Sequence, residues 1–235
     1  MPERTPTPPR GGFWTTLDEA ERAALRAVAR PRTYAVKMPL CYQGDESDHI
    51  IVIERGWAKV TSATEDGHEV VLAVRGPGDL IGESAGLGDR QRSATVTAIS
   101  TLWGLVVPAG RFAMFLDEHP RAWRMVSGTF IRRLDDAGRR VQAHASAEAS
   151  RRLALLLLDL CDLSEQYDRP GPDGSIEIRP PLSQEELGSW VDASRETVAR
   201  ALKEWRALGL VRTGRRKITI LDRPRLLAYA RRRPE

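Results

Sequence analysis

The spacing of apolar residues changes along this chain and predicts different kinds of structure in its different parts. Over residues 17–30 apolar positions recur every three or four residues, with acidic side chains early and arginine late, which predicts a short amphipathic helix. Over residues 34–107 short β-branched runs such as Ile50-Ile51-Val52-Ile53 are separated by glycines, a pattern typical of closely spaced strands. Glu65-Asp66-Gly67 indicates a hairpin turn, because glycine tolerates positive φ. This part is therefore predicted to form a compact β barrel or sandwich.

A long helix is predicted after His119-Pro120, over residues 120–146. One face has residues spaced alternately four and three apart, the a/d pattern of a coiled coil. They are Trp123, Ser127, Phe130, Leu134, Ala137, Val141 and His144. This stripe could pack on the protein's own β domain, but its persistence over three heptads favours a parallel homodimer. The expected dimer-interface residues are Phe130, Leu134, Ala137, Val141 and His144.

Two capped helices are predicted in the last third of the chain, after an apolar helix at residues 151–163. Ser183 and Glu186 have the spacing of a capping box, so the first helix begins at Ser183. Ser194 caps the second helix, which continues to Leu208. Its predicted buried stripe is Val198, Ala201, Leu202, Trp205 and Leu208. Two short helices with a tight connection predict a helix-turn-helix.

The outer face of the second helix has side chains that can recognise DNA bases. It begins with Arg195 and Glu196 and continues with Arg200 and Lys203. Arginine can donate two hydrogen bonds to guanine O6 and N7, and glutamate can accept one from cytosine N4, from a helix that fits the major groove. We therefore expect Arg195, Glu196 and Arg200 to contact bases. The alternative is an ordinary helical pair with solvated arginines.

A basic wing is predicted next, because residues 209–220 have the pattern of two strands around a basic turn. Such a turn is placed to contact the DNA backbone. The expected phosphate contacts, which include both capping serines, are Ser183, Ser194, Lys203, Arg215, Arg216 and Lys217. From Arg179 onward 14 Lys and Arg stand against 7 Asp and Glu, a net charge of +7, whereas the preceding residues have a net charge of −3. This asymmetry favours a phosphate-rich partner, with nucleic acid as the leading candidate. Together with the capped helix that presents arginines, it makes double-stranded DNA the expected partner.

Composition excludes several classes of protein. Of 235 residues 41% are hydrophobic and 29% charged, which is enough to bury a core. No apolar run approaches the roughly 20 residues of a membrane span, and residues 1–12 lack an apolar signal segment, so we expect a disordered tail, a cytoplasmic protein and no membrane partner. Cys41 and Cys161 are too few and too far apart for a zinc or iron–sulfur site, so no metal is expected.

Two segments resemble a known family. Residues 182–220, centred on Ser194-Arg195-Glu196-Thr197-Val198-Ala199-Arg200, resemble the winged helix of the cyclic-AMP receptor protein/fumarate–nitrate regulator (Crp/Fnr) superfamily. Gly78-Asp79-Leu80-Ile81-Gly82-Glu83, followed by Arg92-Ser93-Ala94-Thr95-Val96, resembles the phosphate-binding cassette of that superfamily. The similarity covers nearly all of residues 13–225. It implies a DNA-binding transcription regulator that acts on a palindromic operator, with RNA polymerase as a further partner.

The resemblance also implies an α+β fold in which an N-terminal β-roll sensor like a cyclic-nucleotide-binding domain is followed by a long dimerisation helix and a C-terminal winged helix-turn-helix. The expected divisions are a disordered tail at 1–12, the β-roll effector-sensing domain at 13–119, the dimerisation helix at 120–146 and the DNA-binding domain at 147–235. A hinge is expected near residues 147–151. Rotation there would change the spacing of two recognition helices, which must lie about 34 Å apart to enter successive major grooves.

The cassette residues indicate an anion site for an effector. Glu83 can accept a hydrogen bond from a ribose hydroxyl, Arg92 can pair with a cyclic phosphate, and Gly82 and Ser93 can present donors. One alternative is that Glu83 and Arg92 pair with each other in a degenerate pocket, which would make the regulator ligand-independent.

Two departures from the cyclic-AMP pattern limit what the effector can be. Ala137 and Gly138 complete the expected effector-binding set, but they stand where the resemblance implies hydroxyl residues that bond adenine, and neither has a hydroxyl. The separation of nine positions between Glu83 and Arg92 is also one shorter than in the receptor's cassette. We expect a cyclic nucleotide or similar phosphate ligand bound without adenine-selective contacts, and no tightly held cofactor.

An enzyme is the main alternative class. A cupin-type β-barrel enzyme needs convergent metal ligands, commonly including a His-x-His pair, and the sequence has neither that pair nor a nucleophile elbow nor a Walker phosphate loop. We therefore expect no catalytic residue. A third class, a sensor whose basic tail binds protein or RNA, does not account for the capped helix that presents arginines.

Overall fold

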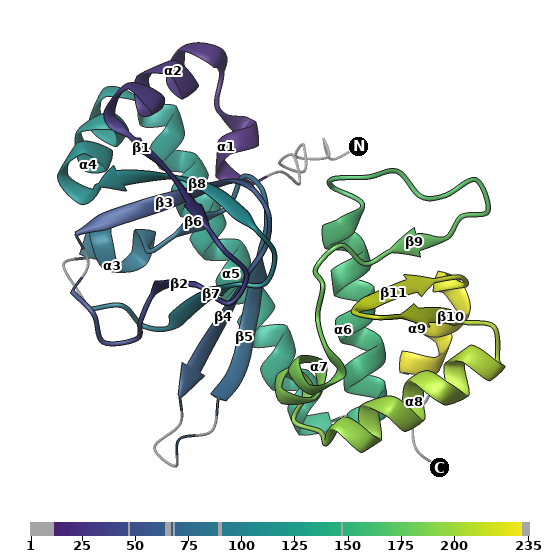
Figure 1. The fold of residues 1–235 in the computed structure, drawn as a ribbon. Coiled ribbons are helices and arrows are strands. Elements are labelled where there is room, and N and C mark those ends of the chain that lie inside the picture. The colour runs from purple at the N-terminus through teal and green to yellow at the C-terminus, as the bar shows by residue number, and fades with distance from the viewer. Residues whose placement is uncertain are drawn as a thin grey trace, which may run out of the picture.

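Two four-stranded sheets form the N-terminal half of this computed structural model, which describes residues 12–46, 48–63, 67, 69–88, 91–146 and 148–231. One sheet has the order β1 (Arg30–Tyr34), β8 (Leu102–Pro108), β3 (His49–Arg55) and β6 (Leu80–Ile81). The other has the order β2 (Pro39–Cys41), β7 (Thr95–Ala98), β4 (Ala58–Ala63) and β5 (Glu69–Arg75). All these strand pairs are antiparallel. The predicted β domain is confirmed (Figure 1).

Strand β3 is buried on both faces, which explains its unbroken apolar run. Ile51 and Ile53 pack with residues of both sheets, including Val96 of the facing sheet. Ile50 and Val52 belong to a second cluster with Phe112 and other helical side chains, because alternate residues of a strand point to opposite faces. The helices of this second layer are α1 (Phe13–Thr16), α2 (Glu19–Val28), α4 (Ala109–Glu118) and the beginning of α5 (Pro120–Ser146).

Helix α2 is shorter than the predicted helix at 17–30. Asp18 caps it in a capping box with Glu21, and it ends at Val28. Arg30 already belongs to β1, because a residue that precedes proline, here Pro31, is disfavoured in the α conformation. The patterns also missed α1, α4 and the short α3 (Glu83–Gly88).

The hairpin and tail predictions are tested only in part. Strands β4 and β5 pair as an antiparallel hairpin, but Glu65 and Asp66 of the predicted turn lie outside the described residues. Of the predicted tail only Gly12 is described, and the hydrogen bond from the amide of Trp14 to the carbonyl of Gly78 (2.9 Å) holds the chain there against the β domain.

The C-terminal domain is a helix-turn-helix with a wing, as predicted. Its elements are α6 (Ala149–Ser164), β9 (Ile176–Glu177), α7 (Gln184–Val191), α8 (Arg195–Ala207), β10 (Val211–Gly214), β11 (Lys217–Ile220) and α9 (Arg223–Arg231). Strands β10 and β11 form the wing and β9 adds a third, unpredicted strand. The core surrounds Trp205, which is fully buried and meets the ring of Tyr229 edge-on at 5.4 Å. The prediction that Leu208 is buried was wrong: it follows the last residue of α8 and is 46% exposed.

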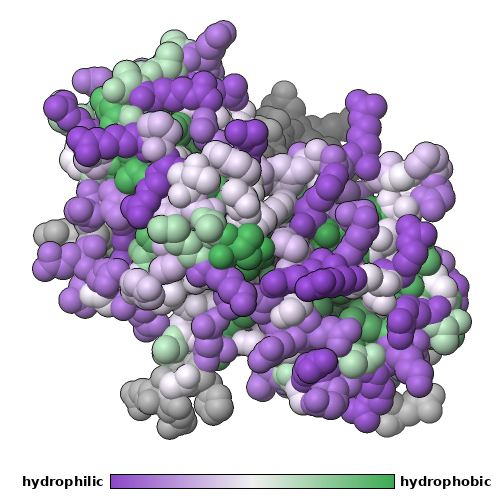
Figure 2. All heavy atoms as spheres, viewed as in Figure 1, coloured by the Kyte–Doolittle hydropathy of each residue, from purple (hydrophilic) through white to green (hydrophobic). Residues whose placement is uncertain are grey.

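The two domains share one hydrophobic core. Trp57, Val74 and Ile99 of the β domain belong to the same buried cluster as the leucines of α6 and the core of the helix-turn-helix. Helix α7 lies beside β5 (Figure 1). Figure 2 shows a mostly hydrophilic surface over the C-terminal domain, with scattered apolar residues. In the described part of the chain, no helix has the length and apolar character that crossing a membrane requires.

Candidate DNA interface and effector site

The turn between α7 and α8 is fixed by local hydrogen bonds. The hydroxyl of Ser183 accepts from the amide of Glu186 (3.1 Å), while the carboxylate of Glu186 accepts from the amide of Ser183 (2.8 Å). Asp192 ends α7 in the left-handed conformation (φ 51°), and Ser194 caps α8 by accepting from the amide of Thr197 (3.1 Å). The caps at Ser183 and Ser194 are those that the sequence predicted.

A residue outside the motif also holds this turn. Arg152 of α6 donates to the carbonyls of Val191 (2.8 Å) and Asp192 (2.9 Å), which satisfies acceptors at the end of α7. No local pattern in the sequence pointed to Arg152, because it lies about 40 residues from its acceptors.

The predicted base-contacting residues share the exposed face of α8. Arg195, Glu196 and Arg200 are exposed, as is Lys203. Within the described part of the chain, none of these four side chains has a hydrogen-bond or ion-pair partner. Their charged groups are therefore solvated and free to contact a duplex.

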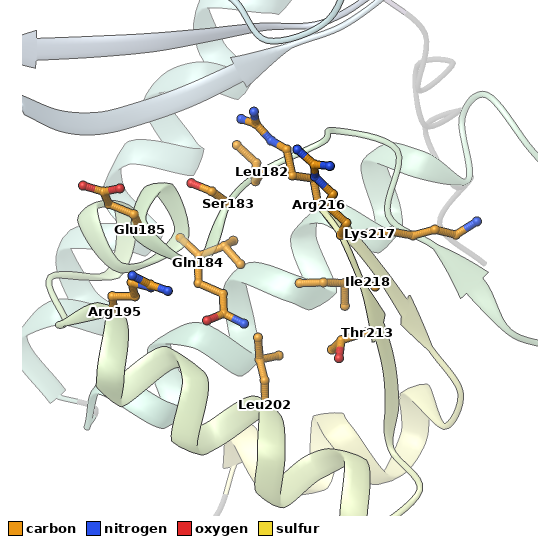
Figure 3. Close-up of a pocket in the computed structure, with 13 residues that line it drawn as sticks. Leu182, Ser183, Gln184, Glu185, Arg195, Leu202, Thr213, Arg216, Lys217 and Ile218 are labelled. Atoms are coloured by element: carbon orange, nitrogen blue, oxygen red, sulfur yellow. The ribbon is translucent and has the colours of Figure 1, made fainter.

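A hollow of about 370 Å³ lies between the start of α7, helix α8 and the wing (Figure 3). The predicted contact residues that line it are Ser183, Arg195, Arg215, Arg216 and Lys217. Figure 3 shows Arg195 and Gln184 on one side of the hollow and the wing strands on the other, with Lys217 extending away from it. The fold thus brings the predicted positive charge of the wing and the recognition helix around one concave surface.

The three wing residues that were predicted to contact phosphate differ in what they contact. Arg216, at a positive φ of 53°, donates to the carboxylate of Glu186 (3.0 Å) and to the carbonyl of Pro181 (2.9 Å). Lys217 pairs with Glu177 of β9 (2.6 Å). Arg215 is exposed and has no partner among the described residues. Of these three residues, Arg215 is therefore the most available to phosphate.

The carboxylate of Glu186 interacts with Ser183, Lys59 and Arg216. Burial by itself would raise its pKa, but hydrogen bonds from Ser183 and the charges of Lys59 and Arg216 outweigh that effect, so the pKa of Glu186 lies below its ordinary value. Glu186 is therefore ionised at neutral pH.

The cassette forms a second candidate site in the β domain. Gly82 adopts φ 79°, and a Cβ there would lie 1.4 Å from Nη1 of Arg92, so the guanidinium lies directly against the glycine backbone. Arg92 is only 4% exposed and donates through Nη2 to the carbonyl of His49 (2.6 Å). Its Nε and Nη1 are buried and have no partner among the described residues. Buried donors of a charged group cost free energy unless they are paired, so this geometry suits an anion.

The family models match the two domains in which these candidate sites lie. Residues 31–119 match the family model of the cyclic nucleotide-binding domain, and residues 151–229 match that of the Crp-like helix-turn-helix domain. The "cAMP-activated global transcriptional regulator CRP" of Pasteurella multocida is 30% identical over 72% of this chain and 79% of its own length.

The chain belongs to the Crp/Fnr family of transcription regulators.

Two further relatives cover more of this Crp/Fnr-family chain. The "CRP-like cAMP-activated global transcriptional regulator" of Mycobacterium tuberculosis is 24% identical over 94% of this chain and 97% of its own length. The solved structure of the "c-di-GMP Responsive Global Regulator CLP" of Xanthomonas campestris has a TM-score of 0.73 and 20% identity, and covers 87% of this chain and 100% of that chain. The predicted fold of a β-roll, a long helix and a winged helix-turn-helix is confirmed.

In this Crp/Fnr-family protein the carboxylate of Glu83 does not pair with Arg92. It is buried and pairs with Arg133 of α5, whose Nη2 also donates to the carbonyl of Leu80 (2.9 Å). The structure therefore contradicts the alternative in which Glu83 and Arg92 pair with each other. Sequence reasoning missed Arg133, although Arg133 lies one helical turn before Ala137 and so shares its side of α5.

Arg75, at the end of β5, is a second cation that the patterns missed. Its Nη1 donates to the carbonyl of Val74 (3.1 Å), and it forms no ion pair with any described residue. Burial lowers the pKa of Arg75 to about 10, and the charge of Arg133 acts in the same direction. Positive charge therefore accumulates where β5, the cassette and α5 meet.

The other predicted effector residues are more open. Ser93 is exposed, and so are Ala137 and Gly138 on α5. A Cβ on Gly138 would meet no atom within 4 Å. At these two positions α5 presents only a methyl group and backbone.

The predicted dimer stripe on α5 divides into two parts. Phe130 is half-buried against the protein's own β domain, as the intramolecular alternative predicts for this position. Beyond it, Leu134 is 74% and Val141 71% exposed, and Ile131 beside the stripe is 62% exposed. The side chain of His144 lies outside the described residues. An apolar stripe that no described residue covers remains on α5.

Proposed function

We propose that this Crp/Fnr-family regulator acts as a homodimer on a two-fold symmetric operator, and that a phosphate-bearing nucleotide in the β-roll changes its affinity for DNA. The observation on which the effector assignment depends is Arg92, buried against Gly82 with Nε and Nη1 unpartnered among the described residues. Cyclic AMP and c-di-GMP are the effectors that the names of its relatives print, so both belong to the candidate class.

The DNA contacts divide into base and phosphate contacts. Arg195, Glu196 and Arg200 are assigned to base edges, because they are exposed on the first turns of a helix that a major groove accommodates. Phosphate contacts are assigned to the capping serines, to the later part of α8 and to the wing: Ser183, Ser194, Lys203, Arg215, Arg216 and Lys217. Among the three wing residues assigned here, Arg215 is the strongest candidate for a phosphate contact, since Arg216 and Lys217 already have carboxylate partners.

The homodimer is supported by the exposed stripe of α5. Leu134 and Val141 have the a/d spacing of a parallel coiled coil and are more than two thirds exposed in the single chain. Apolar side chains in such a row favour a second copy of the same helix, because a symmetric dimer lets one stripe cover another. Two recognition helices then face successive grooves of the operator.

The effector is proposed to be a nucleotide whose phosphate accepts hydrogen bonds from the buried Nε and Nη1 of Arg92. Glu83 is available to a ribose hydroxyl through Oε2, which is buried and unpartnered within the described part of the chain. Arg75 and Arg133 favour a ligand of high negative charge. Ala137 and Gly138 provide no hydroxyl, so the ligand is not selected by hydrogen bonds from these two side chains to adenine.

Calorimetry tests the effector assignment. Cyclic AMP, cyclic GMP and c-di-GMP are titrated separately into the dimer, and we expect heat from at least one of them. Arg92→Met should abolish that heat, while Arg111→Met, an exposed arginine on α4, should retain it. No heat from any of the three nucleotides would favour the ligand-independent alternative and contradict the effector assignment.

DNA binding tests the division of contacts. A duplex is first selected from a random pool by the wild-type protein, and its affinity is compared with that of a scrambled duplex. Arg195→Ala or Arg200→Ala should cost about 1–3 kcal/mol on the selected duplex and little on the scrambled one, whereas Arg215→Ala should weaken both alike. Equal losses on both duplexes for all three variants would contradict the assignment.

A further inference from the structure

Strand β5 lies at the edge of its sheet, and a single serine of α7 occupies its free side. In the sheet order β2-β7-β4-β5, one side of β5 has no neighbouring strand among the described residues. The hydroxyl of Ser189 donates to the carbonyl of Glu69 (2.7 Å) and accepts from the amide of Val71 (3.3 Å). Residues two apart on a strand direct their backbone groups to the same side, so one hydroxyl satisfies both. The first helix of the helix-turn-helix is thus hydrogen-bonded to the backbone of the sensor domain.

An ion-pair chain runs alongside this contact. Lys59 of β4 pairs with Glu69 (2.7 Å) and lies 3.6 Å from the carboxylate of Glu186 at the start of α7. Glu186 in turn pairs with Arg216 of the wing (3.0 Å). Lys59 is only 18% exposed, so its charge is partly shielded from water and its interaction with Glu186 is stronger than that of a surface pair. The sensor domain therefore contacts the residue that connects α7 to the wing.

The same strand leads into the effector cassette. The hydroxyl of Tyr167, from the C-terminal domain, donates to the carbonyl of Pro77 (2.7 Å), and its ring meets Trp57 edge-on at 5.2 Å. Pro77 directly precedes Gly78, where the cassette begins. The contacts at Ser189, Lys59 and Tyr167 therefore all lie on β5, on its partner strand or on the segment between β5 and the cassette.

This docked arrangement leaves the DNA-contacting surface open. Arg195, Arg200 and Arg215 remain exposed and have no partner in the described chain while α7 rests on β5. Docking thus covers a different side of the helix-turn-helix from the one that faces DNA. It fixes the orientation of the domain without competing with the duplex.

We propose that Ser189 and Lys59 are positioning residues for DNA binding, which hold α7 on the edge of β5 and so orient the recognition helix and wing for simultaneous contact with both half-sites of an operator. A dimer bound to two half-sites needs both DNA-binding domains in a fixed orientation. If each DNA-binding domain is docked only part of the time, the apparent affinity for the operator is multiplied by the docked fraction once for each subunit. A docked fraction of about one third in each subunit weakens operator binding roughly tenfold.

Ser189→Ala tests the proposal in the full-length dimer. Alanine preserves α7, because it is the better helix former, but removes both hydrogen bonds to β5. We expect operator affinity to fall about tenfold or more, with less than a twofold change on scrambled DNA. Amide hydrogen exchange of the segment that contains Val71 should become faster. Ser189→Thr, which keeps the hydroxyl, should restore both properties, and Ser62→Ala is the matched control, because its hydroxyl contacts Gln43 and not α7.

Lys59→Met adds an independent variant, since it removes the charge but keeps most of the side-chain length. It should lower operator affinity in the same direction as Ser189→Ala, with less than a twofold change on scrambled DNA. Faster exchange at Val71 with wild-type or tighter operator binding would overturn the proposal, and so would unchanged exchange in Ser189→Ala. Loss of binding to scrambled and selected DNA alike would instead implicate the DNA contacts themselves, and would also overturn a positioning role.

Discussion

Leu134 provides a sharp test of how two copies of the chain associate. Its side chain lies at an a position of the stripe on α5 and is 74% exposed in the single chain. Replacing it by alanine should leave the folded monomer nearly unchanged, because a largely exposed side chain contributes little packing and alanine is a better helix former. The substitution should instead weaken the association of the two chains.

The magnitude follows from the exposed fraction. Complete burial of a leucine side chain contributes about 1.5–3 kcal/mol, so covering the exposed 74% contributes about 1–2 kcal/mol in each chain. A symmetric dimer buries two copies. Since alanine retains only Cβ, Leu134→Ala should weaken the dimer by about 2–3 kcal/mol, which raises the dimer Kd about 30- to 150-fold.

Sedimentation equilibrium over a range of protein concentrations measures that constant directly. Asp135→Ala is the matched control, because it changes the neighbouring exposed residue at a b position, off the stripe. Circular dichroism should give the same helix content for both variants. If Leu134→Ala and Asp135→Ala have the same dimer Kd, α5 does not form the dimer interface through this stripe.

Three further outcomes follow from the described contacts. In urea titrations, Gly82→Ala should lower the free energy of unfolding by more than Gly44→Ala does. Both glycines have φ near 80–90°, but only at Gly82 would the new Cβ collide with Arg92, so equal losses of unfolding free energy would contradict that contact. The pKa of Glu186 is lowered in the folded state, so its ionised form stabilises the fold above the ordinary pKa of 4.5, and this stabilisation disappears as the pH falls through the folded pKa. The unfolding free energy of Glu186→Gln should therefore fall less than that of wild type when the pH is lowered, and parallel curves of unfolding free energy against pH would refute this. Burial raises the pKa of Cys161 to about 12, so iodoacetamide at pH 8 should leave this thiol unmodified unless urea is added. Mass spectrometry measures the modification, and a modified Cys161 in the native protein would contradict its burial.

Short-range patterns predicted the helix-turn-helix well. The capping serines and the buried stripe around Trp205 depend on residues three or four positions apart, which interact in the same way in any context. The exposed face of α8 follows from that stripe, because a helix that buries one side presents the other. The base-contacting candidates could therefore be named without a structure.

The effector site was predictable only in outline. Its glycine and arginine were identified, but the partner of Glu83 is Arg133, 50 residues away on a different element. The wing was similarly incomplete: Arg216 pairs with Glu186, 30 residues away. No local spacing distinguishes these pairs from the many other combinations of opposite charge in the chain.

By itself, then, the sequence determined the order of β domain, long helix and winged helix, together with the side of each helix that is buried, because periodicity and caps act within a few residues. Only the tertiary structure decided which charges meet, that Phe130 turns toward its own domain, and that Ser189 lies on the free edge of β5. Those outcomes depend on how whole elements pack, and packing brings together residues whose separation along the chain carries no signal of their contact.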